Sequence, residues 1–260
     1  VKLFLATLGS RGDFEPFLNF AIQAKSVGHH VTIAATSEFV DQVLSHGIDC
    51  VPLSGSFQDM IQDSGVSVIQ AMKEFNTTVK PVMTSALNRV VDAILEQKPD
   101  AVIYHPKVLS APIAAQNIGA ISVVVELAPL ITPTREFGAA GLGSGNLGPF
   151  NRLSYSLVAQ SSSLFSKELK NISKNVGIPL RNADYSVCLV SPSILKRPKD
   201  WNEKTQIVGP WVSSVNSSRE SQKVIDFIQA APTVYFGFGS MATGDAKRRT
   251  EIVISAAKAV

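Results

Sequence analysis

The turn at residues 7–13 is the sequence feature that most constrains the fold. The apolar run at residues 3–6 precedes it, and apolar residues at helical spacing follow it from Phe14 onward. This order is typical of the first strand-to-helix turn of an α/β sheet, where Gly9 and Gly12 let the backbone turn tightly and approach a ligand. Ligands of open α/β sheets bind beyond the carboxyl ends of the strands, so we expect this turn at the mouth of a binding crevice.

Strand patterns alternate with helical patterns along the chain. The strand patterns cover residues 2–6, 31–35, 49–53, 101–104, 121–125, 186–190 and 206–208. The helical pattern at residues 151–175 is the longest, and we expect it to be a single helix with Leu153, Leu157, Leu164, Leu169 and Ile172 facing the core. The βαβα order predicts an α/β fold with a Rossmann-like, doubly wound parallel sheet and helices on both faces.

The same patterns predict three segments. Residues 1–210 are expected to form one Rossmann-like domain, and residues 211–232, rich in serine at their start, are expected to be a linker. A strand at residues 233–238 and a helix at residues 246–260 begin a second Rossmann-like domain that the sequence leaves incomplete, since two such domains need about 300 residues or more. An uncovered apolar strand offers unpaired backbone groups to another chain, so we expect residues 233–260 to form a homodimer contact or to be loosely held.

Composition excludes several classes of protein. The net charge is only +3 and the basic residues are scattered, which argues against a nucleic-acid partner. Cys50 and Cys188 have neither metal nor redox spacing. No apolar run is long enough to span a bilayer and no signal peptide is recognisable, so we expect a cytoplasmic protein with at most peripheral membrane contact.

The motif within the turn is more specific than its position. The spacing Gly9-x-x-Gly12 lacks the third glycine of the dinucleotide-binding fingerprint. Residues 9–16 read G-S-R-G-D-F-E-P and resemble the amino-terminal signature G-[ST]-R-G-D-x-x-P of GT-B glycosyltransferases, in the branch of sterol and glycopeptide-antibiotic glycosyltransferases. The stretches that support this resemblance are residues 28–34, 133–137, 208–211 and 236–240.

The resemblance covers the whole chain, but only the front part of such an enzyme. It implies that residues 1–210 are the acceptor-binding domain and that residues 233–260 begin the nucleotide-sugar-binding domain. It implies an inverting transfer of a sugar, glucose above all, from a nucleotide diphosphate sugar such as UDP-glucose to a lipophilic hydroxyl compound. Sterols, terpenoids and natural-product aglycones are the acceptors it suggests. It implies no cofactor and no metal, and the sequence contains no Asp-x-Asp pair.

Asp13 has two interpretations. By spacing alone, an aspartate before a helix is most often an N-cap that accepts a backbone N–H and favours the positive helix end. By resemblance, Asp13 is the catalytic base that deprotonates the acceptor hydroxyl, and its charge favours an oxocarbenium-like sugar. No histidine precedes His29, so Asp13 is the only early candidate.

The resemblance also suggests donor-binding residues. Ser10 and Gly12 would face the donor diphosphate or sugar, although both residue types also simply shape turns. Gly239 and Ser240 stand between a predicted strand and a predicted helix, where unpaired backbone N–H groups bind anions. Their matched counterparts contact the donor diphosphate, whereas the alternative role for Ser240 is that of an ordinary N-cap.

Candidate acceptor-binding residues follow from strand ends and from aromatic content. His105 follows the fourth predicted strand and Glu126 the fifth, which places both at the crevice edge. Phe137 lies beside the glycine-rich loop at residues 138–149, where it would form an apolar wall. A structural hydrogen-bonding role for the two polar residues, and a core position for Phe137, remain alternatives.

Two other functions compete with sugar transfer. A nucleotide-sugar epimerase has the same two-domain shape but does not need the G-S-R-G-D signature. A non-catalytic or split acceptor-binding half would need a partner chain for donor binding. We therefore expect residues 1–260 alone to be an inactive fragment that binds donor weakly and transfers no sugar.

Overall fold

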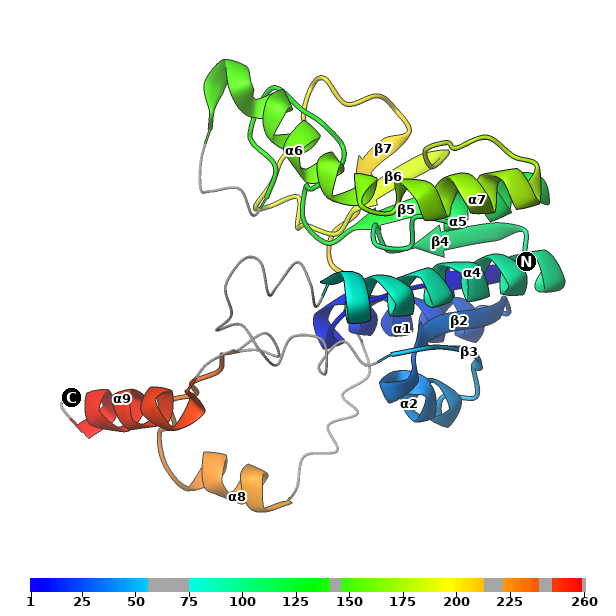
Figure 1. The fold of residues 1–260 in the computed structure, drawn as a ribbon. Coiled ribbons are helices and arrows are strands. Elements are labelled where there is room, and N and C mark those ends of the chain that lie inside the picture. Colours follow the sequence, from blue (N-terminus) through cyan, green and yellow to red (C-terminus); the bar gives the residue numbers. More distant parts are fainter. Residues whose placement is uncertain (56–74, 141–145, 213–221, 239–244, 259–260) are drawn as a thin grey trace.

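The computed structural model describes residues 1–55, 75–140, 146–212, 222–238 and 245–258 (Figure 1). Its centre is a seven-stranded sheet in the order β3-β2-β1-β4-β5-β6-β7, and all six strand pairings are parallel. The strands are β1 (Lys2–Ala6), β2 (His30–Thr36), β3 (Asp49–Leu53), β4 (Ala101–Tyr104), β5 (Ile121–Glu126), β6 (Tyr185–Cys188) and β7 (Thr205–Ile207). The predicted Rossmann-like parallel sheet is confirmed.

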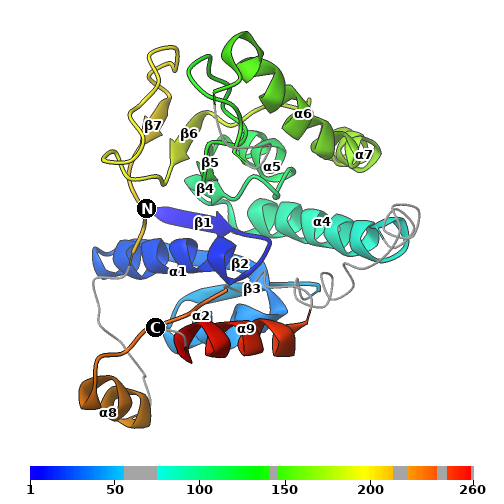
Figure 2. The same cartoon turned by 90° about the vertical axis from the view of Figure 1, so that its left-hand side faces the viewer.

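Helices cover both faces of the sheet (Figure 2). The helices that the structure describes are α1 (Arg11–Ser26), α2 (Val40–Ser45), α4 (Lys80–Gln97), α5 (Ala111–Asn117), α6 (Asn151–Ser163), α7 (Ser166–Val176), α8 (Gln222–Ala230) and α9 (Ala246–Lys258). Single turns of 3₁₀-helix lie at Ser37–Phe39 and Gly148–Phe150, and a π-helical turn at Phe75–Val79 leads into α4.

Alternation along the strands divides the apolar core in two. On β1, Phe4 joins the cluster beneath α4, α5 and α7, whereas Leu5 joins the cluster beneath α1 and α2. A strand buried on both faces must be apolar throughout, which explains the continuous apolar run at residues 3–6. The two clusters fix the sheet rigidly between its helical layers.

One predicted helix is two helices. Residues 151–175 divide into α6 and α7, and Phe165 between them is only 7% exposed. Turning Phe165 into the core requires the chain to change direction there. Ile172 on α7 is buried as predicted, but the expected core positions Leu153, Leu157 and Leu164 are about half exposed, so their assignment was wrong.

Residues 233–238 form no strand, contrary to the sequence prediction. A strand needs a neighbour for its backbone hydrogen bonds, and no described strand pairs with this segment. Its side chains are exposed to solvent, Tyr235 to 89% and Val234 to 75%. Helices α8 and α9 lie apart from the sheet and its covering helices (Figure 1). The division into residues 1–210, 211–232 and 233–260, and the dimer contact, stay predictions.

Candidate functional site

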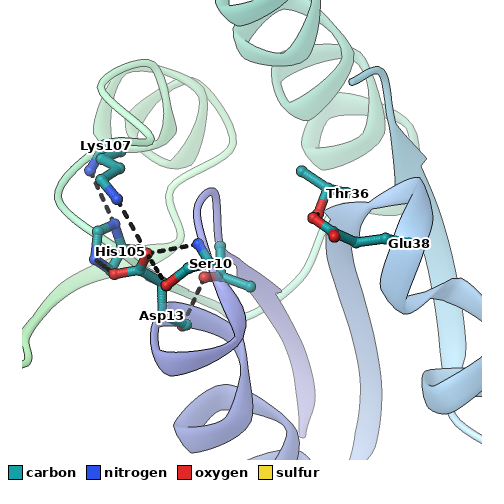
Figure 3. A network of polar contacts seen from close by, with 7 residues as sticks. Ser10, Asp13, Thr36, Glu38, His105 and Lys107 are labelled. Carbon is teal, nitrogen blue, oxygen red and sulfur yellow. Dashed lines mark hydrogen bonds and ion pairs between the residues drawn. The ribbon is translucent and has the colours of Figure 1, made fainter. Parts of the chain in front are cut away.

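The candidate site lies where the order of the strands in the sheet reverses, between β1 and β4. β1 continues through α1 to β2 on one side, whereas β4, which pairs with the other side of β1, continues away to β5. Such a reversal opens a crevice at the carboxyl ends of the two strands. The segments that leave β1 and β4 at this point carry Asp13 and His105, which meet there (Figure 3).

Asp13 is held by the turn that contains it. Helix α1 begins at Arg11 with Ser10 as the N-cap residue, so Asp13 is the third helical residue and not the N-cap expected from spacing. Its carboxylate Oδ2 nevertheless accepts the backbone N–H of Ser10 at 2.8 Å, as the acidic residue of a capping box does. Thr7 Oγ1 donates to the Asp13 carbonyl oxygen at 2.8 Å. The helix-capping role is therefore real, and it orients the carboxylate.

His105 and Lys107 complete the cluster. His105 Nε2 lies 3.2 Å from Asp13 Oδ1, and Lys107 Nζ lies 3.0 Å from Asp13 Oδ2. The backbone N–H of Lys107 donates to His105 Nδ1 at 3.2 Å. A neutral imidazole with an acceptor at Nδ1 carries its proton on Nε2, so the ring donates to Asp13.

The pKa values of the cluster follow from burial and charge. Burial alone raises the pKa of Asp13, but the hydrogen bond from His105 and the charge of Lys107 outweigh it and hold this pKa well below its usual value. Burial lowers the pKa of His105, although the hydrogen bond and charge of Asp13 act in the opposite direction. At neutral pH the pair is therefore a carboxylate beside a neutral imidazole.

The two carboxylate oxygens of Asp13 have different surroundings. Among the described residues, Oδ2 contacts Ser10 N, Ser10 Oγ at 3.4 Å and Lys107 Nζ, whereas Oδ1 contacts only His105 Nε2. The side chain is 17% exposed. Oδ2 is thus the anchored oxygen, and Oδ1 keeps lone-pair capacity for an incoming hydroxyl group.

Gly9 makes room for this arrangement. Its φ of +143° lies where residues other than glycine are strained, and a Cβ atom there would stand 1.9 Å from Asp13 Oδ2 and 2.8 Å from Lys107 Nζ. The first glycine of the motif is therefore required by the carboxylate that follows it.

Replacing Gly9 is expected to displace the carboxylate. Gly9→Ala should cost more stability than Gly28→Ala, since Gly28 has φ +91° but nothing within 4 Å of its missing Cβ. Thermal unfolding gives the two losses, and nitrogen NMR of the imidazole reports the Asp13–His105 contact. Gly9→Ala should shift the His105 signals and Gly28→Ala should not. Equal losses with unchanged His105 signals in both variants would contradict this role.

Glu126 is the last residue of β5 and is fully buried. Its Oε2 accepts the backbone N–H groups of Leu130 and Ile131 at 2.9 Å each and that of Thr132 at 3.3 Å. Its Oε1 accepts the hydroxyl groups of Thr132 and Ser186. Both oxygens thus hold the loop after β5, which is the structural alternative, and the side chain has no exposed surface for an acceptor.

A cavity of about 360 Å³ lies beside the first turn of α1. Trp211 forms part of its wall and stacks on Phe20 with ring centroids 4.5 Å apart, while its carbonyl oxygen accepts a hydrogen bond from Asn19 at 3.2 Å. The wall is mostly apolar and consists of Gly12, Glu15, Pro16, Asn19, Leu127, Leu189, Pro210, Trp211 and Val212.

A comparison with protein families decides what kind of domain holds this site. Residues 3–126 match the family described as the glycosyltransferase family 28 N-terminal domain. We call this matched segment, residues 3–126, the family 28 domain. The resemblance inferred from residues 9–16 is thereby confirmed. The matched segment contains the turn after β1 and the segment after β4, and so includes the Asp13 cluster.

Curated relatives and solved structures agree with this family 28 domain. The chain is 24% identical over 280 residues to the sterol 3-beta-glucosyltransferase UGT80A2 of Arabidopsis thaliana, covering 98% of the chain and 44% of that protein. It is 26% identical over 282 residues to a sterol 3-beta-glucosyltransferase of Cryptococcus neoformans, covering 98% of the chain and 18% of that protein. The chain thus spans less than half the length of these two relatives.

The solved structures show the fold. The glycosyltransferase of kitacinnamycin superposes with a TM-score of 0.56 at 17% identity, covering 84% of this chain and 53% of that one. The calicheamicin glycosyltransferase CalG4 gives 0.53 at 17% identity, covering 80% and 52%. The fold is therefore that of the amino-terminal half of GT-B glycosyltransferases.

The family 28 domain brings some predicted site residues together and leaves others apart. Asp13, Ser10 and His105 form one cluster, and Gly12 lines the neighbouring cavity. Phe137 is half-buried in the loop after β5, and its acceptor contact stays a prediction. Gly239 and Ser240 lie outside the described residues.

Lys107 is a cluster member that the sequence analysis missed. It stands two residues after His105 in the segment leaving β4, so the strand-end argument that selected His105 also applied to it. Residue type gave no further signal, because one lysine among many is ordinarily a solvated surface residue.

In the part of the chain that the structure describes, no three or more His, Cys, Asp or Glu side chains are placed to hold a metal ion. No described helix is both long enough and apolar enough to cross a membrane.

Proposed function

We propose that this protein is an inverting glycosyltransferase that moves glucose from UDP-glucose to a hydroxyl group of a sterol or another lipophilic acceptor. The family 28 domain and the sterol glucosyltransferase relatives support the reaction class and the acceptor class. The observation that carries the proposal is the Asp13 carboxylate at the strand-order reversal, which is anchored through Oδ2 and contacts His105 through Oδ1.

Asp13 Oδ1 is the proposed proton acceptor. The acceptor oxygen forms a bond to the anomeric carbon as the bond from that carbon to the diphosphate breaks. The hydroxyl proton goes to Asp13, and the nucleoside diphosphate leaves with the electron pair. The carboxylate charge also favours the oxocarbenium-like sugar. A carboxylate with a low pKa suffices when proton transfer follows bond cleavage.

The other predicted residues have supporting roles. His105 donates to Oδ1 and fixes the plane of the carboxylate. Ser10 and Gly12 face the donor, and the backbone at Gly239 and Ser240 binds its diphosphate, which needs no metal in this scheme.

A product assay tests the proposal. The protein expressed from its full-length gene is incubated with UDP-glucose and a panel of sterols. Mass spectrometry is expected to show a hexosyl sterol, and proton NMR should show a β-linkage formed from the α-linked donor. Release of an epimerised free sugar would instead favour the epimerase. Donor binding without turnover of any acceptor would favour a non-catalytic acceptor-binding protein.

A further inference from the structure

Lys107 touches both members of the Asp13–His105 pair. Its backbone N–H donates to His105 Nδ1, and its ammonium group lies 3.0 Å from Asp13 Oδ2. The first contact sets the imidazole tautomer and does not depend on the side chain. The second places a positive charge beside the pair and depends on the side chain entirely. The two contributions of this residue are therefore separable by mutation.

We infer that Lys107 is a positioning residue whose ammonium group keeps the pair in the state from which sugar transfer starts, with an Asp13 carboxylate and a neutral His105 imidazole. This inference rests on the proposed function. Lys107 acts through Asp13 and His105 and needs no contact with the sugar.

The electrostatics of the crevice support this role. A second positive charge on His105 is unfavourable beside the Lys107 ammonium group, and the charge of Lys107 accordingly lowers the pKa of His105 beyond the effect of burial. Without that ammonium group, burial alone opposes the hydrogen bond and the charge of Asp13, so the pKa of His105 rises and the imidazolium forms more readily. The resulting imidazolium binds Oδ1 more tightly and leaves it a weaker acceptor for a hydroxyl proton.

Within the described ranges, the other charged residues near this edge have contacts of their own. Arg11 pairs with Glu15 at 2.9 Å on α1. Glu38, in the 3₁₀ turn after β2, accepts a hydrogen bond from Thr36 at 3.2 Å (Figure 3). Helix α5, which follows the Lys107 segment, contains no charged residue. The charge effects on the pKa of Asp13 come from Lys107 and His105. Lys107 is thus the charge that can tune the pair.

NMR titration of the His105 imidazole tests the inference. Lys107→Met should raise the pKa of His105, because it removes a positive charge that lowers this pKa. The acidic limb of the turnover profile should move to higher pH in the same variant. Lys107→Arg should restore both, because it keeps the charge and the backbone contact. Lys196→Met removes an exposed lysine far along the chain and should change neither.

The titration distinguishes a failure of the Lys107 inference from a failure of the proposed function. An unchanged His105 pKa in a folded Lys107→Met variant would overturn the inference, as would a failure of Lys107→Arg to restore the wild-type value. Neither result depends on turnover. Absence of sugar transfer by the wild-type protein would count against the proposed function instead.

Discussion

Asp13→Asn is expected to lower turnover by about 10²–10⁴-fold, the usual contribution of a general base. An amide cannot accept the acceptor proton at neutral pH. Donor affinity should change little, because the carboxylate is proposed to act on the acceptor hydroxyl. Steady-state kinetics with a sterol acceptor and calorimetry with UDP-glucose measure the two quantities.

The helix-capping role of Asp13 requires a matched control. The amide also weakens the contacts to Ser10 and Lys107, so we expect a modest fall in the melting temperature, equivalent to about 1 kcal/mol. Asp41 is an exposed aspartate in the first turn of α2, so Asp41→Asn removes an equivalent helix-end charge without touching the site. That variant should keep full turnover. Near-normal turnover of Asp13→Asn would reduce Asp13 to a capping residue.

The fold was accessible from sequence because its strands are buried on both faces. The patterns at residues 2–6, 49–53 and 101–104 coincide with β1, β3 and β4. The apolar spacing at residues 151–175 did not predict the break at Phe165. A continuous row of apolar residues does not show where a helix must end so that the chain can follow the sheet. The apolar pattern at residues 233–238 predicted a strand. A strand also needs a neighbouring strand for its backbone hydrogen bonds, and the β propensity of its residues does not supply one.

The site was predicted in part for the same physical reason. Asp13 and His105 could each be placed at the carboxyl edge of the sheet, since both follow predicted strands. Their contact depends on the pairing of β1 with β4. Local sequence patterns predict strands but do not predict which strands pair with one another. The contact explains why a buried histidine stands after β4, and why the glycine at position 9 precedes the carboxylate.

Among the proposed variants, Glu126→Ala is expected to lose the most stability, because Glu126 is buried. Glu126→Ala removes the acceptor for three backbone N–H groups and two hydroxyl groups around the loop after β5. A donor left unsatisfied in a buried site costs about 1–3 kcal/mol. The Ser186 hydroxyl is buried, whereas the loop donors are partly buried, so water offsets part of their cost. We expect a loss of at least about 3 kcal/mol, which corresponds to a fall of roughly 6–12 °C in the melting temperature of a domain of this size.

The control for this loss is a glutamate in a different setting. Glu96 is exposed on α4, so Glu96→Ala should change stability by less than about 0.5 kcal/mol. Hydrogen exchange should localise the effect of Glu126→Ala, because the amides of Leu130 and Ile131 lose their acceptor while those of Val102 and Ile103 keep their strand partners. If those two loop amides stayed protected and the melting temperature held, the loop would be fixed by other contacts. Glu126 would then not be the residue that holds this loop.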